Sequence, residues 1–153
     1  ISSTESTMSR LVFALYAALL LVSAHAQTQL PIAELTAGFH RIEAEVASDQ
    51  ASQAKGLMHR RSMPANHGML FVFSRTDRHC MWMRNTLLPL SVAFLDAQGK
   101  IINIEEMKPQ TEDNHCAASP APYALEMNLG WFSDKGLKPG FQIGGIEKIR
   151  RNQ

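Results

Sequence analysis

The chain has 153 residues, with 15 lysines and arginines against 14 aspartates and glutamates, and a formal net charge of +1. Before the C-terminal Lys148, Arg150 and Arg151, no basic cluster is denser than Arg60-Arg61. A nucleic-acid-binding face would need a basic patch or stripe, so we expect no nucleic-acid partner. The sequence also contains no phosphate-binding loop and no strong metal motif, so we expect no cofactor.

The first 26 residues have the pattern of a secretory signal peptide. Met8 is the expected start, and Arg10 precedes an apolar run over Leu11–Val22 and a small-x-small cleavage site at Ala24-His25-Ala26. The alternative is a membrane anchor, but spanning a bilayer takes about 20 apolar residues. We therefore predict cleavage after Ala26. The mature protein, residues 27–153, is then a single exported domain, periplasmic or secreted from a bacterium, with no membrane attachment.

The remaining chain predicts short strands separated by turns. Ile42, Ala44 and Val46 alternate with charged residues, which is typical of a strand with one face in water. Residues 48–57 suit a short helix with Ser48 as its N-cap. Further strands are predicted at 69–73, 90–95, 100–104, 123–127 and 141–143, with a helical turn at 131–135, a polar connection at 74–78 and a long loop at 108–122. This pattern predicts an all-β fold with one or two short helices, a compact single-domain sandwich or barrel.

The mature chain has two cysteines, Cys80 and Cys116. In an oxidising compartment such a pair favours a disulfide. Free thiols are the second possibility. A metal site is the third, because each cysteine follows a histidine, His79 and His115. Neighbouring residues of a strand point to opposite faces, which argues against the metal site.

If residues 79–84 are extended, His79, Met81 and Met83 share one face. Imidazole and thioether groups favour Cu(I), and His67 stands in a similar H-x-M sequence with Met69. A periplasmic copper-binding protein is thus one hypothesis for the function. The competing interpretation, which we favour, is that these methionines fill the core.

The opposite face of the same segment predicts a binding site for a small polar ligand, such as a glycan or an anionic envelope metabolite. Trp82 offers a flat apolar surface, and Arg84 and Asn85 offer hydrogen-bond donors. Arg60 and Glu126 are further charged residues within apolar segments. The competing interpretation is an Arg–Glu pair that fixes the fold, for example Arg84 with Glu126, and a tryptophan that belongs to the core.

Catalysis is less well supported than binding. His67, His115, Asp96 and Glu126 are the available acid–base candidates, but the sequence has no G-x-S-x-G element and no spacing that implies a catalytic triad. We lean towards a monomeric binding module, with a structural or protein-interaction role as a further alternative.

Several ordered blocks resemble one known family. They include KGLMHR, GMLFVF and MWMRNT, and they lie at residues 55–60, 68–73, 81–86, 89–90, 94–96, 123–126 and 136–140. Over residues 43–143 the chain is similar to the exported-protein family called domain of unknown function 192 (DUF192). The resemblance implies a compact mostly-β domain and carries no established activity. Arg84 departs from the family, whose members usually have lysine there, and its planar fork would allow a two-bond contact with a carboxylate or phosphate.

Overall fold

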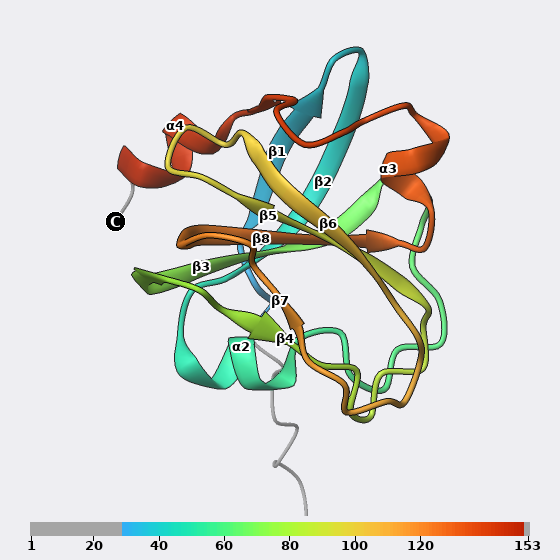
Figure 1. Ribbon diagram of the computed structural model, residues 1–153. Helices are drawn as coiled ribbons and strands as arrows, with labels where there is room; N and C mark the ends of the chain where they lie inside the picture. Colours follow the sequence, from blue (N-terminus) through green and yellow to red (C-terminus); the bar gives the residue numbers. More distant parts are fainter. Residues whose placement is uncertain (1–28, 152–153) are drawn as a thin grey trace, which may run out of the picture.

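The computed structural model describes residues 29–151, which fold into a strongly curled β-sheet with three short helices (Figure 1). The main sheet has seven strands in the order β6-β5-β8-β3-β2-β1-β9, and β4 and β7 form a separate pair. Among the described strands, β2 and β3 pair in parallel and the other pairs are antiparallel. The strands are β1 (Ile32–Ala37), β2 (His40–Ala47), β3 (His67–Asp77), β4 (Cys80–Met81), β5 (Leu90–Leu95), β6 (Ile101–Met107), β7 (His115–Cys116), β8 (Ala121–Asn128) and β9 (Ile143–Gly144). The helices are α2 (Gln50–Lys55), α3 (Trp131–Asp134) and α4 (Ile146–Arg151).

The two edges of the curled sheet are joined at one end. The amide of Ile101 in β6 donates to the carbonyl of Phe141 over 2.9 Å, and the amide of Ile143 in β9 donates to the carbonyl of Gly99 over 2.9 Å. Gly99 has a φ of +84°, and a Cβ there would lie 2.6 Å from the Ile143 oxygen. Only glycine therefore fits this turn without strain. The hydrogen bonds between the two edges give the sheet the shape of a half-barrel.

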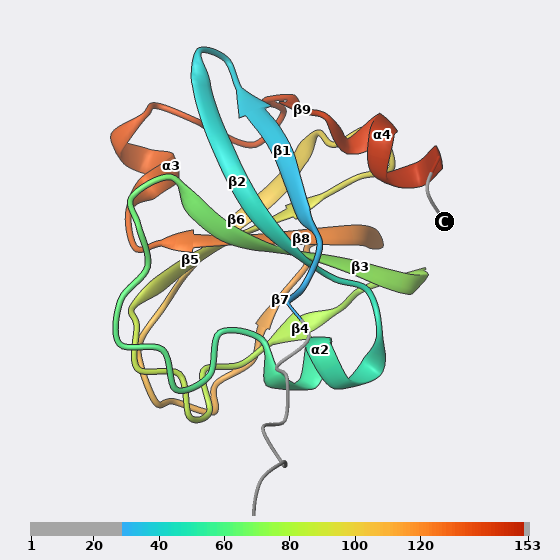
Figure 2. The same cartoon turned by 180° about the vertical axis from the view of Figure 1, so that it is seen from behind.

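The sheet separates two apolar layers. The inner layer fills the concave side and includes residues from both edges of the sheet and from α3 and α4, among them Leu35, Leu70, Leu95, Ile101, Leu125, Phe132, Ile143 and Ile146. The outer layer lies on the convex side and includes Leu57, Met69, Phe71, Met81, Met83, Leu90, Val92, Phe94 and Met107. All six residues of β5 are buried, because that strand contributes to both layers. Figures 1 and 2 show α3 and α4 at one end of the molecule, and α2, β4 and β7 at the other.

The β4–β7 pair is linked to the main sheet. Cys80 and Cys116 face each other across the two strands and form a disulfide, the state that the sequence favoured. The side-chain amide of Asn103 in β6 donates to the Cys116 carbonyl over 3.1 Å, and its oxygen accepts the amide of Ala118 over 2.9 Å. The pair therefore covers the outer layer as part of the domain.

The predicted all-β class is confirmed, but several boundaries were wrong. β3 continues to Asp77, so residues 74–78 are not a plain connection, and the predicted loop at 108–122 contains β7 and the start of β8. The N-cap of α2 is Asp49, one residue after the predicted Ser48. The sequence did not predict β1 or α4. The predicted signal peptide lies outside the described residues, and among residues 29–151 no helix is long and apolar enough to cross a membrane.

The disulfide gives the first testable prediction. The Cys80→Ser, Cys116→Ser double variant should keep its β-sheet signal in circular dichroism, because the two apolar layers are intact. Its free energy of unfolding should fall by about 4 kcal/mol, the loop-closure value for cysteines 36 residues apart. Urea titration followed by tryptophan fluorescence, to which buried Trp131 contributes, measures this change. Reduced wild-type protein is the matched control, and unfolding curves that do not differ between the oxidised and reduced forms would contradict the prediction.

Candidate functional site

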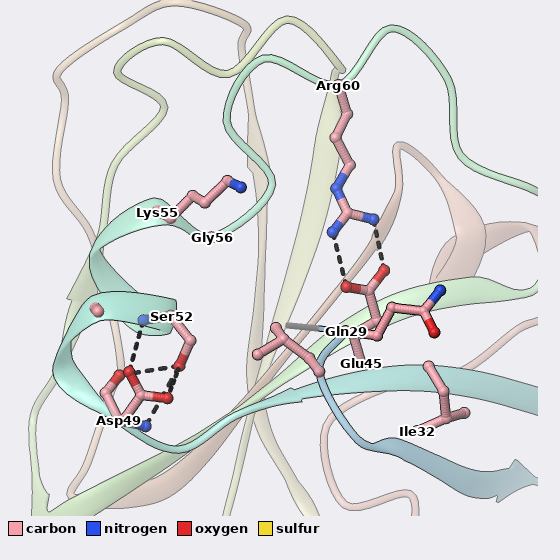
Figure 3. A pocket seen from close by; sticks show the side chains of 10 residues that line it. Gln29, Ile32, Glu45, Asp49, Ser52, Lys55, Gly56 and Arg60 are labelled. Carbon is pink, nitrogen blue, oxygen red and sulfur yellow. Dashed lines mark hydrogen bonds and ion pairs between the residues drawn. The ribbon is translucent and has the colours of Figure 1, made fainter. Parts of the chain in front are cut away.

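A hollow with a volume of about 770 Å³ lies between α2, the start of β1 and the segment that follows α2 (Figure 3). Its charged lining residues are Glu45, Asp49, Lys55 and Arg60, and its apolar ones include Leu30 and Ile32. Ligand sites of small molecules have volumes of about 300–1,000 Å³ and combine an apolar surface with a few polar groups. The hollow has both properties.

Arg60 and Glu45 form one wall of the hollow. Nη1 and Nη2 of Arg60 donate to Oε1 and Oε2 of Glu45 over 2.5 and 2.7 Å, the two parallel bonds of a fork. Glu45 projects from the wet face of β2, and both side chains are about one-third exposed. The hydrogen bond from Arg60 holds the pKa of Glu45 below its usual value, against the opposing effect of burial. The same bond raises the pKa of Arg60, so both groups are charged at neutral pH.

Helix α2 forms the facing wall, and its ends are fixed by local interactions. Oδ1 of Asp49 accepts the amide of Ser52 over 2.9 Å, and the Ser52 hydroxyl oxygen accepts the amide of Asp49 over 3.3 Å; this is a capping box. The bonds from Ser52 keep the pKa of Asp49 low. Gly56 ends the helix with a φ of +47°, a conformation that L side chains rarely adopt. The chain then turns away from α2 and reaches Arg60.

Arg60 is the predicted ligand residue that lines this hollow; Trp82, Arg84, Asn85 and Glu126 are not among its lining residues. Trp82 and Arg84 instead form an exposed pair in the β4–β5 loop. The guanidinium carbon of Arg84 lies 5.5 Å from the centre of the Trp82 ring, and Nε lies 3.6 Å from Oε1 of Glu112. Trp82 is 45% exposed, so it is not a core residue.

Asn85 holds two loops together through its backbone. It is one of three non-glycine residues with positive φ in the described chain, at 55°, with His59 at 65° and Gln110 at 57°. The amide of His59 donates to the Asn85 carbonyl over 2.9 Å, and the amide of Gln110 donates to the carbonyl of Thr86 over 3.0 Å. The loop that carries Asn85 is therefore hydrogen-bonded to the loop of His59 and, through Thr86, to the loop of Gln110. Residues in this conformation persist only where the surrounding structure holds them.

Glu126 is buried in the outer layer. It lies in β8 between Met69 of β3 and Val92 of β5 and is 4% exposed. Burial raises its pKa to about 8, and it makes no hydrogen bond or ion pair with the described residues. The Arg84–Glu126 pair that the sequence allowed is wrong, because Arg84 pairs with Glu112 and Arg60 pairs with Glu45.

The four residues of the copper hypothesis each have other contacts. Met81 and Met83 are buried in the outer layer. His79 stacks on Phe73 with ring centres 3.7 Å apart, and its Nε2 lies 2.8 Å from the carbonyl oxygen of Arg75. His67 lies 3.4 Å from Glu43. Within residues 29–151, no group of three or more His, Cys, Asp or Glu side chains is placed to hold a metal ion.

Most of the residues that line the hollow are not apparent from the sequence. The alternating pattern marks Glu45 only as a charged position on the wet face of a strand, and the predicted N-cap is Ser48, whereas the observed one is Asp49. Ile32 belongs to the unpredicted strand β1 and is 55% exposed. The available signal was the sequence Ser48-Asp49 at the start of an Ala- and Gln-rich segment, where aspartate is as good an N-cap as serine.

These features define a small mostly-β domain with an open, mixed polar and apolar hollow at the edge of a half-barrel. The chain belongs to the DUF192 family, described as uncharacterized ACR, whose family model matches residues 32–145. No curated protein matches the chain.

Two solved structures are similar over most of their length. One is a candidate transcription regulator from Sinorhizobium meliloti 1021, 34% identical, with a TM-score of 0.74 over 78% of this chain and 98% of that one. The other is a protein of unknown function from Novosphingobium aromaticivorans DSM 12444, also 34% identical, with a TM-score of 0.72 over 79% of this chain and 90% of that one. They support the fold and the family, and the family carries no established activity.

The raised pKa of Glu126 gives a second prediction. The folded protein holds this proton up to about pH 8, whereas the unfolded chain releases it near the ordinary value of 4.5. The contribution of Glu126 to the free energy of unfolding should therefore be largest below pH 4.5. It should fall as the pH rises towards 8, at up to about 1.4 kcal/mol per pH unit. Glu126→Gln should remove this slope and be more stable than the wild type at pH 8–9.

Urea unfolding of the oxidised protein between pH 5 and pH 9 measures the effect of Glu126. Glu106→Gln, at an exposed position of β6, is the control and should keep the wild-type slope. Parallel pH profiles for Glu126→Gln and the wild type would show that Glu126 is ionised in the folded protein, contrary to the prediction.

Proposed function

We propose that this domain binds a small polar ligand in the hollow beside Arg60. The observation that carries the proposal is the fork between Arg60 and Glu45, which places charged donors and acceptors in the wall of an open hollow of about 770 Å³. Both side chains of the pair are also partly exposed, so a ligand in the hollow can reach their donors and acceptors.

Two further features suit a binding site. The walls are fixed before a ligand arrives, because the capping box and Gly56 set the ends of α2 and the fork holds Arg60 in one orientation. A pre-organised site loses little conformational freedom on binding. Leu30 and Ile32 supply apolar surface on the remaining side, which a ligand with a carbon skeleton could cover.

A ligand screen by thermal shift, followed by calorimetric titration of the best compound, tests this function. We expect Arg60→Gln to weaken the ligand's affinity about tenfold or more, because hydrogen bonds to a charged group are lost. In amide NMR spectra the ligand should shift Ser52 and Gly56, which line the hollow.

Two control variants locate the site. Arg75→Ala alters an exposed arginine on β3 and should leave the affinity unchanged. Arg84→Ala tests the Trp82–Arg84 surface. If Arg84→Ala abolishes binding and Arg60→Gln does not, the ligand lies on that surface and the hollow is not the site.

We further propose that the domain works after export to the periplasm. The signal-peptide pattern over residues 8–26 and a disulfide, a bond typical of oxidising compartments, support this location. Expressed from Met8 in a Gram-negative bacterium, the protein should be recovered from the periplasmic fraction with Gln27 as its first residue and the mass of the disulfide form. A cytoplasmic product that retains residues 8–26 would contradict the proposal.

A further inference from the structure

The positive and negative side chains that line the hollow are equal in number. Glu45 and Asp49 carry two negative charges, and Lys55 and Arg60 carry two positive charges. Arg60 bonds both oxygens of Glu45, and Lys55 is close enough to help lower the pKa of Glu45. The Arg60 guanidinium therefore acts mainly on a carboxylate of the protein itself, and the Lys55 ammonium adds a weaker attraction to the same carboxylate without bonding to it.

An anionic ligand would have to compete with Glu45 for Arg60. Displacing Glu45 would leave its partly buried carboxylate without its partner and next to the negative ligand. Displacement would also remove the hydrogen bond from Arg60 that lowers the pKa of Glu45, and would leave burial to raise that pKa, so the ionised carboxylate would lose its main stabilising contact. Like charges at such close range repel each other, so the intact fork discriminates against anions.

The same fork is suited to an uncharged ligand with several hydroxyl groups. A guanidinium has five N–H donors, and two are used on Glu45, which leaves donors free at Arg60. Each Glu45 oxygen keeps a lone pair, so donors and acceptors stand side by side. A hydroxyl group both donates and accepts, and two neighbouring hydroxyls can bond the arginine and the glutamate without separating them.

From this charge balance we propose that the hollow binds a neutral polyhydroxylated ligand, with the chemistry of a sugar or polyol. The inference rests on the function proposed above and names its ligand class. The exposed side chain of Ile32, together with Leu30, offers an aliphatic surface for the C–H face of a sugar ring. Glu45 has a second role here: it excludes anions by occupying Arg60.

The experiment uses probes that differ by one charge. Glucose and glucuronate share a pyranose ring and differ by a carboxylate, and myo-inositol and inorganic phosphate add a neutral polyol and a simple anion. Each is titrated into the protein while amide NMR signals of Ser52 and Gly56 are followed. We expect a neutral probe to bind the wild-type protein at least tenfold more tightly than glucuronate or phosphate.

Glu45→Gln tests why the wild type rejects anions. The variant keeps the length of the side chain but leaves the charge of Arg60 without a carboxylate partner. Its affinity for glucuronate and phosphate should therefore rise at least tenfold. Binding of these anions should weaken with added salt, whereas binding of the neutral probes should not. Glu43→Gln is the matched control. Glu43 lies two residues away on the same strand, is 61% exposed beside His67 and does not line the hollow, so this variant should behave as the wild type.

The possible results separate the inference from the proposed function. If the wild type binds an anionic probe as tightly as a neutral one, or if Glu45→Gln gains no affinity for anions, the inference is wrong and the hollow remains a ligand site of another class. If no probe binds either protein and the wider screen is also silent, both proposals fail. Should Glu45→Gln not fold, Arg60→Gln replaces it: loss of neutral-probe binding supports the inference, and unchanged binding overturns it.

Discussion

The pairing of β8 with β3 on one side and with β5 on the other holds the two apolar layers of this protein together. The residues of β8 alternate between the layers: Leu125 and Met127 belong to the inner layer and Ala124 to the outer one. Because both faces of these central strands are covered, polar side chains can reach water mainly at the sheet edges and in the loops. This constraint places the candidate site at the edge, where β1, β2 and α2 meet.

Helix α2 shows how the edge site depends on the outer layer. None of its own residues is buried, so the helix is held by what flanks it. Ala47 before it and Leu57 after it are both buried in the outer layer. The side-chain amide of Gln53 donates to the carbonyls of Ala47 and Val72 over 3.1 and 2.8 Å. One wall of the hollow is therefore positioned by the packing of Ala47 and Leu57 on either side of the helix and by the hydrogen bonds of Gln53 within it.

The sequence predicted what alternation and composition can show. β2, β5 and most of β8 follow from runs with a regular apolar pattern, and the all-β class follows from them. β1 was missed because its sequence, IAELTA, has apolar residues at both odd and even positions, with Ile32 exposed and Ala33 buried. The C-terminal end of β3 was not predicted because residues 74–77 are exposed, so no apolar face marks that part of the strand.

The candidate site was less predictable than the fold, because it depends on partners far apart in the sequence. Arg60 could be selected as a charged residue within an apolar segment, but its partner Glu45 is 15 residues away on another element. Trp82 and Arg84 could be expected to share a face, and they do lie together. Glu126 lies neither in the hollow beside Arg60 nor in the Trp82–Arg84 pair; it points into the outer layer, and no local sequence pattern indicates this position.

The two carboxylates of Glu45 and Glu126 show why the hollow and the buried layer have different chemistry. Glu45 is ionised because Arg60 bonds it at the surface, whereas Glu126 keeps its proton because burial has no compensating partner. The segment after α2 connects the two regions: it carries Arg60, is tied to Asn85 through His59, and accepts a hydrogen bond at Met63 from Asn128, two residues after Glu126. Arg60 is therefore held from two sides. Glu45 bonds its guanidinium, and the hydrogen bonds of His59 and Met63 fix the backbone segment that carries it.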